Sequence, residues 1–207
     1  MGKMQSSLKN MVLSLGLITI VAALLLGGVY VLTADTIAKA ELKAQIDAIG
    51  EVAPEFDNNP LEEVYIHKAN AGTKDSLTIE VYPARMGGKL VGAAVKSSSM
   101  NGFSGEISIM YGFKADGTVN NYKVLKHTET AGLGSKMQEW FRSLKGNQSV
   151  LGLNPSKDNM TVSKDGGAVD AITAATITSR AFLEALNSAF EAYCAVTEKD
   201  KEGQNNE

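Results

Sequence analysis

The chain has 207 residues, enough for one ordinary domain with appendages, and its 44% hydrophobic and 21% charged residues are typical of globular proteins. Its formal net charge is −3, and in the absence of a run of basic residues we expect no nucleic acid among its partners. The single cysteine, Cys194, excludes a disulfide or a multi-thiolate site within the chain. Two histidines, His67 and His127, are too few for a histidine-rich centre, so we expect no metal site.

The first feature in chain order is an uncharged apolar stretch. No charged residue occurs from Asn10 to Ala34, and residues 11–33 supply the roughly 20 apolar residues that cross a bilayer as a helix. A secretory signal has a shorter apolar region of about 7–15 residues and a small-residue cleavage site. We therefore predict an uncleaved transmembrane helix over residues 11–33. A cleaved signal and a buried helix of a soluble protein are the less favoured alternatives.

The flanks of this helix predict its orientation. Lys3 and Lys9 precede it, whereas Asp35 follows it almost at once. Because positively charged flanks stay on the cytoplasmic side, residues 1–10 are expected in the cytoplasm and the rest of the chain across the membrane. The sequence predicts a single-pass protein of the inner (cytoplasmic) membrane that contacts membrane lipid and has its soluble domain on the periplasmic side.

A helical stalk is predicted over residues 34–56, which are rich in helix formers. Its apolar positions recur at helical spacings: Ile37, Leu42, Ile46 and Ile49. Gly50 and Pro54 mark its end. The stalk is expected to lead into an extracytoplasmic domain over residues 57–197.

Alternating apolar and polar residues predict most of that domain as strands. They are expected at residues 64–67, 76–84, 89–99, 105–127 (two strands joined by a hairpin at Asp116-Gly117) and 159–163. Helices are expected at residues 136–144 and 177–196, the second with an apolar face of Phe182, Leu186, Ala189, Phe190 and Tyr193, before a disordered polar tail at residues 198–207. The predicted fold class is α+β, a mostly antiparallel sheet with flanking helices after one N-terminal transmembrane helix.

The stretch "HTETAGLGSKM", residues 127–137, joins an expected strand to an expected helix. Gly132 and Gly134 let the backbone approach a ligand closely, and a turn that enters a helix presents unpaired N–H groups. Ser135 is the expected helix cap, and Lys136 lies in the first turn. Because a Gly-x-Gly pair is weak evidence, this stretch alone favours a plain connector over a binding loop.

The stretch "DAITAATITS", residues 170–179, directly precedes the last helix. Thr176 or Thr178 can cap that helix, and the remaining hydroxyls, including Thr173, are surplus to this role. A helix N-terminus also stabilises an anion such as phosphate, although Asp170 opposes this unless its carboxylate points away or binds the amides of the turn. Three interpretations stay open: a plain capped turn, which the residues alone favour, a noncovalent anion site, and a covalent attachment site, which an unactivated threonine disfavours.

Taken together, "NGFSGEISIMYGF", "DGTVNNYKVLKHTETAGLGSKM" and "DAITAATITSRA" carry a resemblance to a known family. Over nearly its whole length the chain resembles the G subunit of Rnf electron-transport complexes, with its FMN-binding domain. It is also similar to the C subunit of the sodium-translocating NADH:quinone oxidoreductase. The chain length fits the Rnf protein better than the generally longer quinone-reductase protein.

The resemblance implies that FMN is the cofactor and that its phosphate is esterified to the hydroxyl of Thr176, the last threonine of Thr173-Ala174-Ala175-Thr176. A dedicated flavin transferase, with FAD as donor and magnesium, would form the bond. Asp170 occupies the acidic position of the transferase signature.

The resemblance also implies roles for the neighbouring residues. Thr173 and Thr178 would donate hydrogen bonds to the phosphate, and residues 129–134 would line the flavin. From its charge alone, and not from the resemblance, Lys136 would favour the reduced, anionic flavin. The implied cofactor-binding residues are Glu129, Thr130, Gly132, Leu133, Gly134, Lys136, Thr173, Ala174, Ala175, Thr176, Ile177 and Thr178. No residue is assigned a catalytic role.

Two residues depart from the family's pattern. Ala174 stands where the motif usually has glycine, and Ala131 stands where the loop usually has proline. Neither change removes an attachment atom. A turn that needs a positive φ at Ala174 would be strained by about 1 kcal/mol, whereas a negative φ would tolerate alanine. We expect the departures to bear on the efficiency of modification.

The function that the resemblance implies is electron transfer within an ion-translocating Rnf-type complex, which couples electron flow between ferredoxin and NAD to sodium or proton movement. The partners would be the other membrane subunits and, during maturation, the flavin transferase. We expect a relay rather than a complete enzyme. The alternatives are the C subunit of the sodium-translocating quinone reductase and an anchored extracytoplasmic module that binds an anionic small molecule noncovalently.

Overall fold

The computed structural model describes residues 8–69 and 77–204. Most of the expected cytoplasmic segment at residues 1–10, and the last three residues of the expected polar tail, lie outside the described residues. The chain divides into two compact units, Met1–Ala44 and Gln45–Glu207, and each is described by itself. One helix, α1 (Leu8–Val52), belongs to both units. The transmembrane helix and the stalk that we expected as two elements are therefore one continuous helix, which ends between Gly50 and Pro54.

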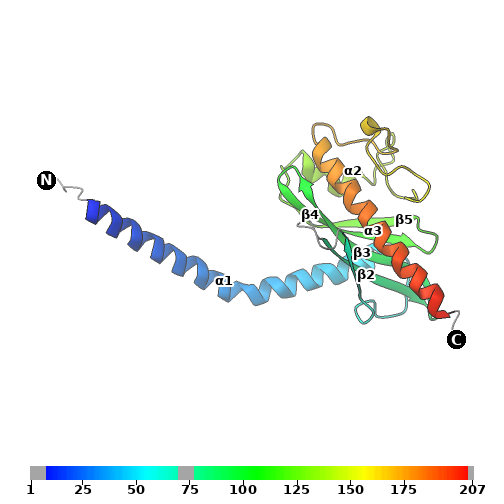
Figure 1. Cartoon of the computed structure of the whole chain (residues 1–207), viewed down its shortest axis with the longest axis horizontal. Coiled ribbons are helices and arrows are strands. Elements are labelled where there is room, and N and C mark those ends of the chain that lie inside the picture. The colour runs from blue at the N-terminus through cyan, green and yellow to red at the C-terminus, as the bar shows by residue number, and fades with distance from the viewer. Residues whose placement is uncertain (1–7, 70–76, 205–207) are drawn as a thin grey trace. The chain divides into compact units, whose positions relative to one another are not determined.

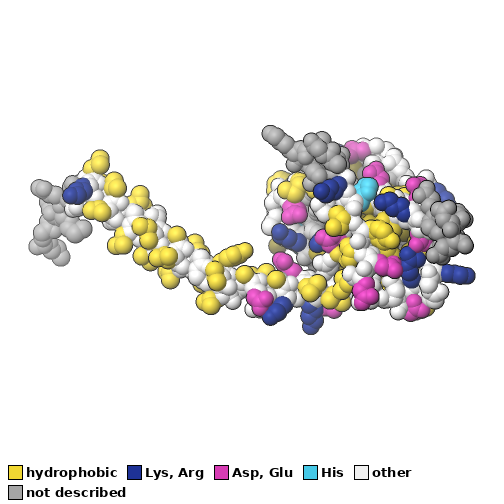
Figure 2. All heavy atoms as spheres, turned by 60° about the horizontal axis from the view of Figure 1, so that its bottom comes forward, with side chains coloured by type: hydrophobic (Ala, Val, Ile, Leu, Met, Phe, Trp, Pro, Cys, Tyr) yellow, Lys and Arg dark blue, Asp and Glu magenta, His cyan; other side chains and the backbone are white. Residues whose placement is uncertain are grey.

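In the first unit, α1 has the composition of a membrane span. An 18-residue window of α1 has a mean hydropathy of 2.5, and no part of this window is buried inside the protein. Figure 2 shows apolar side chains along the surface of the helix. The hydroxyls of Ser14 and Thr33 donate to the carbonyl oxygens of Met11 and Val29 at 3.0 and 2.9 Å, so these polar groups are satisfied without water. One apolar helix of this length fits a single-pass membrane protein.

The second unit is built on a five-stranded antiparallel sheet in the order β1-β2-β3-β4-β5 (Figure 1). The strands are β1 (Tyr65–Ala69), β2 (Leu77–Met86), β3 (Lys89–Gly102), β4 (Gly105–Lys114) and β5 (Val119–Lys126). Glycines with positive φ allow the tight turns: Gly87 and Gly88 join β2 to β3, and Gly117, at 82°, joins β4 to β5. The α+β fold class and the hairpin at Asp116-Gly117 are confirmed.

The long helix α3 (Thr176–Gln204) covers one face of this sheet (Figure 1). Its predicted apolar face is confirmed, with Phe182, Leu186, Ala189 and Tyr193 buried and Phe190 half-buried against the same core. The ring of Phe182 stacks on that of Phe141 with 4.2 Å between centroids. The hydroxyl of Tyr111 on β4 donates to the Phe182 carbonyl oxygen at 2.7 Å, which satisfies a buried polar group within the core.

The C-terminal end of α3 extends farther than the sequence indicated. The helix runs past the expected end at residue 196 and through most of the stretch that we expected to be a polar tail. Arg85 on β2 forms an ion pair with Asp200 at 2.6 Å, and both side chains are largely buried, at 16% and 15% exposure. This tertiary contact accounts for the extension, because composition alone gives these polar residues no reason to be ordered.

The other face of the sheet packs on the last turns of α1. The buried residues there are Ala48, Ile49 and Val52 of α1 and Tyr82, Ala84, Ala94 and Met110 of the sheet. Gly112 permits the contact, because a Cβ at that position would lie 1.8 Å from the Val52 carbonyl oxygen. Of the apolar face expected for the stalk, only Ile49 is buried, whereas Ile37, Leu42 and Ile46 are exposed. The compact unit begins at Gln45, ahead of the expected boundary at residue 57.

Two further elements differ from expectation. The helix expected at residues 136–144 is shorter, because only η1 (Gly134–Lys136) and α2 (Met137–Trp140) form before the chain turns back. The strand expected at residues 159–163 is wrong: one isolated parallel bridge joins Val162 to Val169, and η2 (Ser163–Asp165) follows. The chain reverses at Gly166, whose φ is 82°, before a strand can extend.

Candidate functional site

The two motif stretches meet at a cavity of about 290 Å³. It lies where the loop that follows β5 meets the first turn of α3. The lining residues are Phe103, Glu129, Thr130, Leu133, Gly134, Ala174, Ala175, Thr176, Ile177 and Thr178. All of these except Phe103 belong to the set predicted from the sequence. The structure does not bring Gly132, Lys136 or Thr173 of that set into the lining.

The N-terminus of α3 forms one wall of this cavity. The first backbone bond of the helix runs from the N–H of Ser179 to the carbonyl oxygen of Ala175 at 3.0 Å. Within the described residues, neither the Thr176 hydroxyl nor the N–H groups of Thr176, Ile177 and Thr178 form a hydrogen bond. The helix N-terminus therefore presents three amide donors, a hydroxyl and the positive end of the helix dipole to the cavity. This arrangement binds phosphate.

Ser179, which sequence reasoning missed, holds the turn before the helix. Its hydroxyl is fully buried, accepts from the N–H of Ile172 at 2.9 Å and donates to the carbonyl oxygen of Ala175 at 2.9 Å. The expectation that Thr176 or Thr178 caps the helix is wrong, because the hydroxyl of Ser179, one turn into the helix, reaches back to close this turn. The Thr176 hydroxyl is thereby left available.

Ala174 adopts a left-handed backbone conformation with φ of 63°, which non-glycine residues rarely adopt. The resemblance places it where the motif usually has glycine, and no other non-glycine residue in the described part of the chain has a positive φ. Such a conformation costs an L-residue about 1–2 kcal/mol. The turn that presents Thr176 is therefore strained, and the strain follows from the alanine.

Glu129 joins three segments around the cavity and is 7% exposed. One carboxylate oxygen accepts from the Thr178 hydroxyl at 2.7 Å, and the other accepts from the N–H of Ser104 at 3.0 Å. Two glycines make room for this carboxylate: a Cβ on Gly134 would lie 2.5 Å from one oxygen, and a Cβ on Gly102 would lie 2.7 Å from the other. Glu129 thus ties the helix N-terminus to the β3–β4 turn.

Thr178 and Thr173 do not have the roles expected for them. The hydroxyl proton of Thr178 is directed to Glu129, and its side chain is buried, so it does not serve as a donor to an anion in the cavity. Thr173 is exposed and outside the lining. Of the three threonines in the motif, Thr176 alone combines a hydroxyl without an internal partner with a place on the cavity wall.

The loop between β5 and η1 holds its shape through its own hydrogen bonds. Gly132, with φ of 75°, donates its N–H to the Ser135 hydroxyl at 2.9 Å, and the N–H of Leu133 donates to the Thr130 carbonyl oxygen at 3.2 Å. The expectation that Ser135 caps the next helix is wrong, because its hydroxyl serves this turn. Lys136 is exposed and outside the lining, so the geometry gives no support to an electrostatic role for it.

Three apolar side chains form an exposed rim around the cavity. Phe103, Leu133 and Ile177 are 68%, 41% and 49% exposed and come from the β3–β4 turn, the glycine-rich loop and α3. Phe103 was missed as a lining residue. The sequence feature that could have identified it is an aromatic residue at a hairpin tip, between Gly102 and Ser104-Gly105, where a core position is improbable. Such a rim offers the flat contact that an aromatic ligand requires.

Asp170 faces away from the cavity. Its carboxylate accepts from the N–H of Asn147 at 3.1 Å, and its carbonyl oxygen accepts from the Trp140 indole at 2.9 Å. The acidic residue that opposed an anion site in the sequence is therefore engaged elsewhere. Among the described residues, no group of three or more His, Cys, Asp and Glu side chains is arranged to hold a metal ion.

Comparisons with known proteins agree with this geometry. Residues 102–191 match the family model described as FMN-binding domain, which covers the lining of the cavity. Residues 3–52 match the model described as RnfG N-terminal region, which corresponds to α1.

The relatives share a name and align along most of their length. A protein of Aliivibrio fischeri (strain MJ11) is 34% identical over 195 residues, 92% of each chain. One of Vibrio cholerae (strain M66-2) is 33% identical over 78% of each chain, and one of Stutzerimonas stutzeri is 35% identical over 86% of this chain and 78% of its own. Each is named as the G subunit of an ion-translocating oxidoreductase complex.

Proposed function

The chain belongs to the family of G subunits of ion-translocating oxidoreductase complexes, and on that premise we propose that it relays electrons in an Rnf-type complex through FMN covalently attached to Thr176. The observation that carries the proposal is the Thr176 hydroxyl, which has no hydrogen-bond partner among the described residues and lies at a helix N-terminus on the wall of the cavity. The match to an FMN-binding domain supports the choice of cofactor.

The surroundings of Thr176 fit a phosphate ester. A phosphodiester keeps one negative charge, and the free N–H groups of Thr176, Ile177 and Thr178 would hold it at the positive end of the α3 dipole. Within the described residues no lysine or arginine lines this cavity, so backbone amides would hold the negative charge of the phosphodiester. A flavin transferase would supply the activation that an ordinary threonine hydroxyl lacks.

The cavity and its rim fit the flavin ring. At about 290 Å³ the cavity lies just below the range of roughly 300–1,000 Å³ for pockets that enclose whole ligands. Phe103, Leu133 and Ile177 would contact the apolar part of the ring and leave an edge in solvent, as electron exchange with another protein requires. When bound, FMN supplies the reversible uptake of electrons; these residues orient it and exclude water from its inner face.

The N-terminal match supports the place of the chain in its complex. Residues 3–52 match the RnfG N-terminal region, which favours the Rnf assignment over the C subunit of the quinone reductase. We infer that α1 spans the inner membrane among lipid and the other membrane subunits, and that the domain from Gln45 onward lies on the periplasmic side, as the charges of Lys3, Lys9 and Asp35 indicate. Electron flow between ferredoxin and NAD, coupled to ion movement, is the proposed activity of the whole complex.

The proposal is tested with the full chain produced beside a flavin transferase. Intact mass should show one added FMN in the wild type and in Thr197→Val, whose hydroxyl lies outside the motif and the cavity, and none in Thr176→Val. The complex that carries Thr176→Val should lose turnover from ferredoxin to NAD. Flavin that leaves the polypeptide on denaturation would favour the noncovalent binding module instead. Full turnover with Thr176→Val would contradict the relay.

A further inference from the structure

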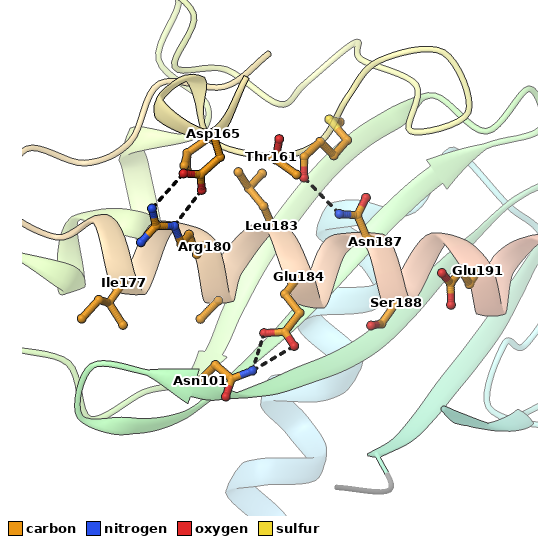
Figure 3. Close-up of a pocket in the computed structure, with 13 residues that line it drawn as sticks. Asn101, Thr161, Asp165, Ile177, Arg180, Leu183, Glu184, Asn187, Ser188 and Glu191 are labelled. Carbon is orange, nitrogen blue, oxygen red and sulfur yellow. Dashed lines mark hydrogen bonds and ion pairs between the residues drawn. The ribbon is translucent and has the colours of Figure 1, made fainter. Parts of the chain in front are cut away.

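A second and larger hollow runs beside α3 and has a volume of about 620 Å³. It is bounded by the outward side of α3 from Ile177 to Glu191, by residues 160–165 and by Asn101 of β3, and Figure 3 shows these side chains around it. We call it the α3 groove. Ile177 lines both this groove and the cavity beside Thr176, so the two adjoin at the first turn of α3.

The charges of the α3 groove do not cancel. Arg180 makes two hydrogen bonds to Asp165, at 2.7 and 2.9 Å, and this guanidinium lowers the pKa of Asp165; the pair is neutral as a whole. Among the described residues, the carboxylate of Glu184 accepts only from neutral donors: the Ser99 hydroxyl at 2.7 Å and the Asn101 amide at 2.9 Å. Figure 3 shows the contact with Asn101. These contacts hold the carboxylate in place and leave its charge uncompensated.

Glu191 adds a second uncompensated charge to the groove. It is exposed and makes no hydrogen bond or ion pair within the described part of the chain. Glu184 and Glu191 are seven residues apart, so they lie about 10 Å from each other along the same side of the helix. Met160 and Leu183 also belong to the lining, but they are 2% and 1% exposed and offer little surface to a partner. The groove therefore complements a segment with two basic side chains about 10 Å apart.

We propose that the α3 groove docks such a basic segment of the protein that exchanges electrons with the FMN on Thr176, an inference that rests on the proposed function. The shared position of Ile177 would bring a segment in the groove next to the exposed flavin edge. Each exchange oxidises one centre and reduces the other by the same number of electrons, and no bond forms or breaks. Complementary charge speeds such encounters and selects the partner.

Two matched double variants test the docking. Glu184→Gln with Glu191→Gln removes the two charges, and glutamine can still accept from Ser99 and Asn101. Glu55→Gln with Glu139→Gln removes the same charge from exposed positions outside the groove. The flavin-loaded full chain is added in detergent to the complex purified without this subunit, and turnover is measured against chain concentration and salt.

We expect the groove variant to need about tenfold more chain for half-maximal turnover at low salt, a difference that shrinks as salt rises. The control variant should match the wild type. Equal half-maximal concentrations and equal salt dependence for the groove variant and the wild type would overturn the inference. The intact mass is measured first, to distinguish failure of the proposed function from failure of the docking inference alone. A wild-type chain without FMN contradicts both, whereas a chain that carries FMN leaves the docking inference to the turnover assay.

Discussion

Ala174→Gly should stabilise the domain, although it replaces a residue with one that usually weakens folded structure. The present alanine holds φ at 63°, at a cost of about 1–2 kcal/mol that glycine does not incur. Against this gain, glycine makes the unfolded chain more flexible, which costs roughly 0.4–1 kcal/mol. With the middle of each range, roughly 1.5 less roughly 0.7, we predict a net gain of about 0.8 kcal/mol in the free energy of unfolding.

A residue of the same segment supplies a matched control. Ala171 has no positive φ, is half-buried and lies outside the helix, so Ala171→Gly gains no relief from strain and should lose roughly 0.4–1 kcal/mol. Urea unfolding of the full chain in detergent measures both changes. Trp140, the single tryptophan of the sequence, reports on this region by fluorescence, because its indole bonds to the Asp170 carbonyl oxygen at 2.9 Å.

The two variants should shift the urea midpoint in opposite directions. A midpoint for Ala174→Gly that is unchanged or lower than that of the wild type would refute the reasoning, because it would mean that the turn before α3 does not hold a strained alanine.

Three other changes test the contacts around the cavity and the second face of the sheet. Glu129→Ala removes the acceptor of two hydrogen bonds and should cost about 2–3 kcal/mol in urea unfolding, whereas Glu139→Ala, on an exposed side chain, should cost nothing measurable. Gly134→Ala places a Cβ 2.5 Å from the Glu129 carboxylate and should cost about 1–3 kcal/mol; a loss no larger than that of Gly50→Ala, where no atom lies within 4 Å, would contradict this. Burial raises the pKa of Glu80, but the Tyr82 hydroxyl and the Lys96 ammonium at 3.2 Å outweigh it and leave the pKa below its ordinary 4.5. The stabilisation from Glu80 is therefore present above pH 4.5 and is lost as the pH falls through the folded-state pKa. Tyr82→Phe should raise that pKa in a carboxyl NMR titration, and an unchanged value would contradict the role of the Tyr82 hydroxyl, leaving Lys96 and the Gln45 amide, which donates to Glu80 at 3.1 Å, as the causes.

The features that depend on neighbours in the sequence were predictable. Asp116-Gly117 predicts a hairpin because glycine supplies the positive φ of the turn, and the spacing of Phe182, Leu186 and Tyr193 predicts which side of the last helix is buried. For Thr176 and the glycine-rich loop, the residues alone favoured a plain capped turn and a plain connector, although a helix start with hydroxyls can hold phosphate; the resemblance to the FMN-binding family singled them out.

The features that depend on distant contacts were not predictable. An acidic residue in a glycine-rich loop is normally solvated, so nothing local indicated that Glu129 is buried against Thr178 and Ser104. Helical spacing alone could not reveal that Ala48 rather than Ile46 faces the sheet, because that choice depends on Gly112 in a strand far along the chain.

The most direct test of the account is the position of FMN on the polypeptide. Trypsin cleaves after Lys164 and Arg180, so residues 165–180 leave the protein as one peptide that contains Thr173, Thr176 and Thr178. Fragmentation mass spectrometry of this peptide, from protein made beside a flavin transferase, should place the FMN mass on Thr176 alone. FMN on Thr173 or Thr178, or an unmodified peptide from cells in which the transferase modifies a known substrate, would contradict the central claim.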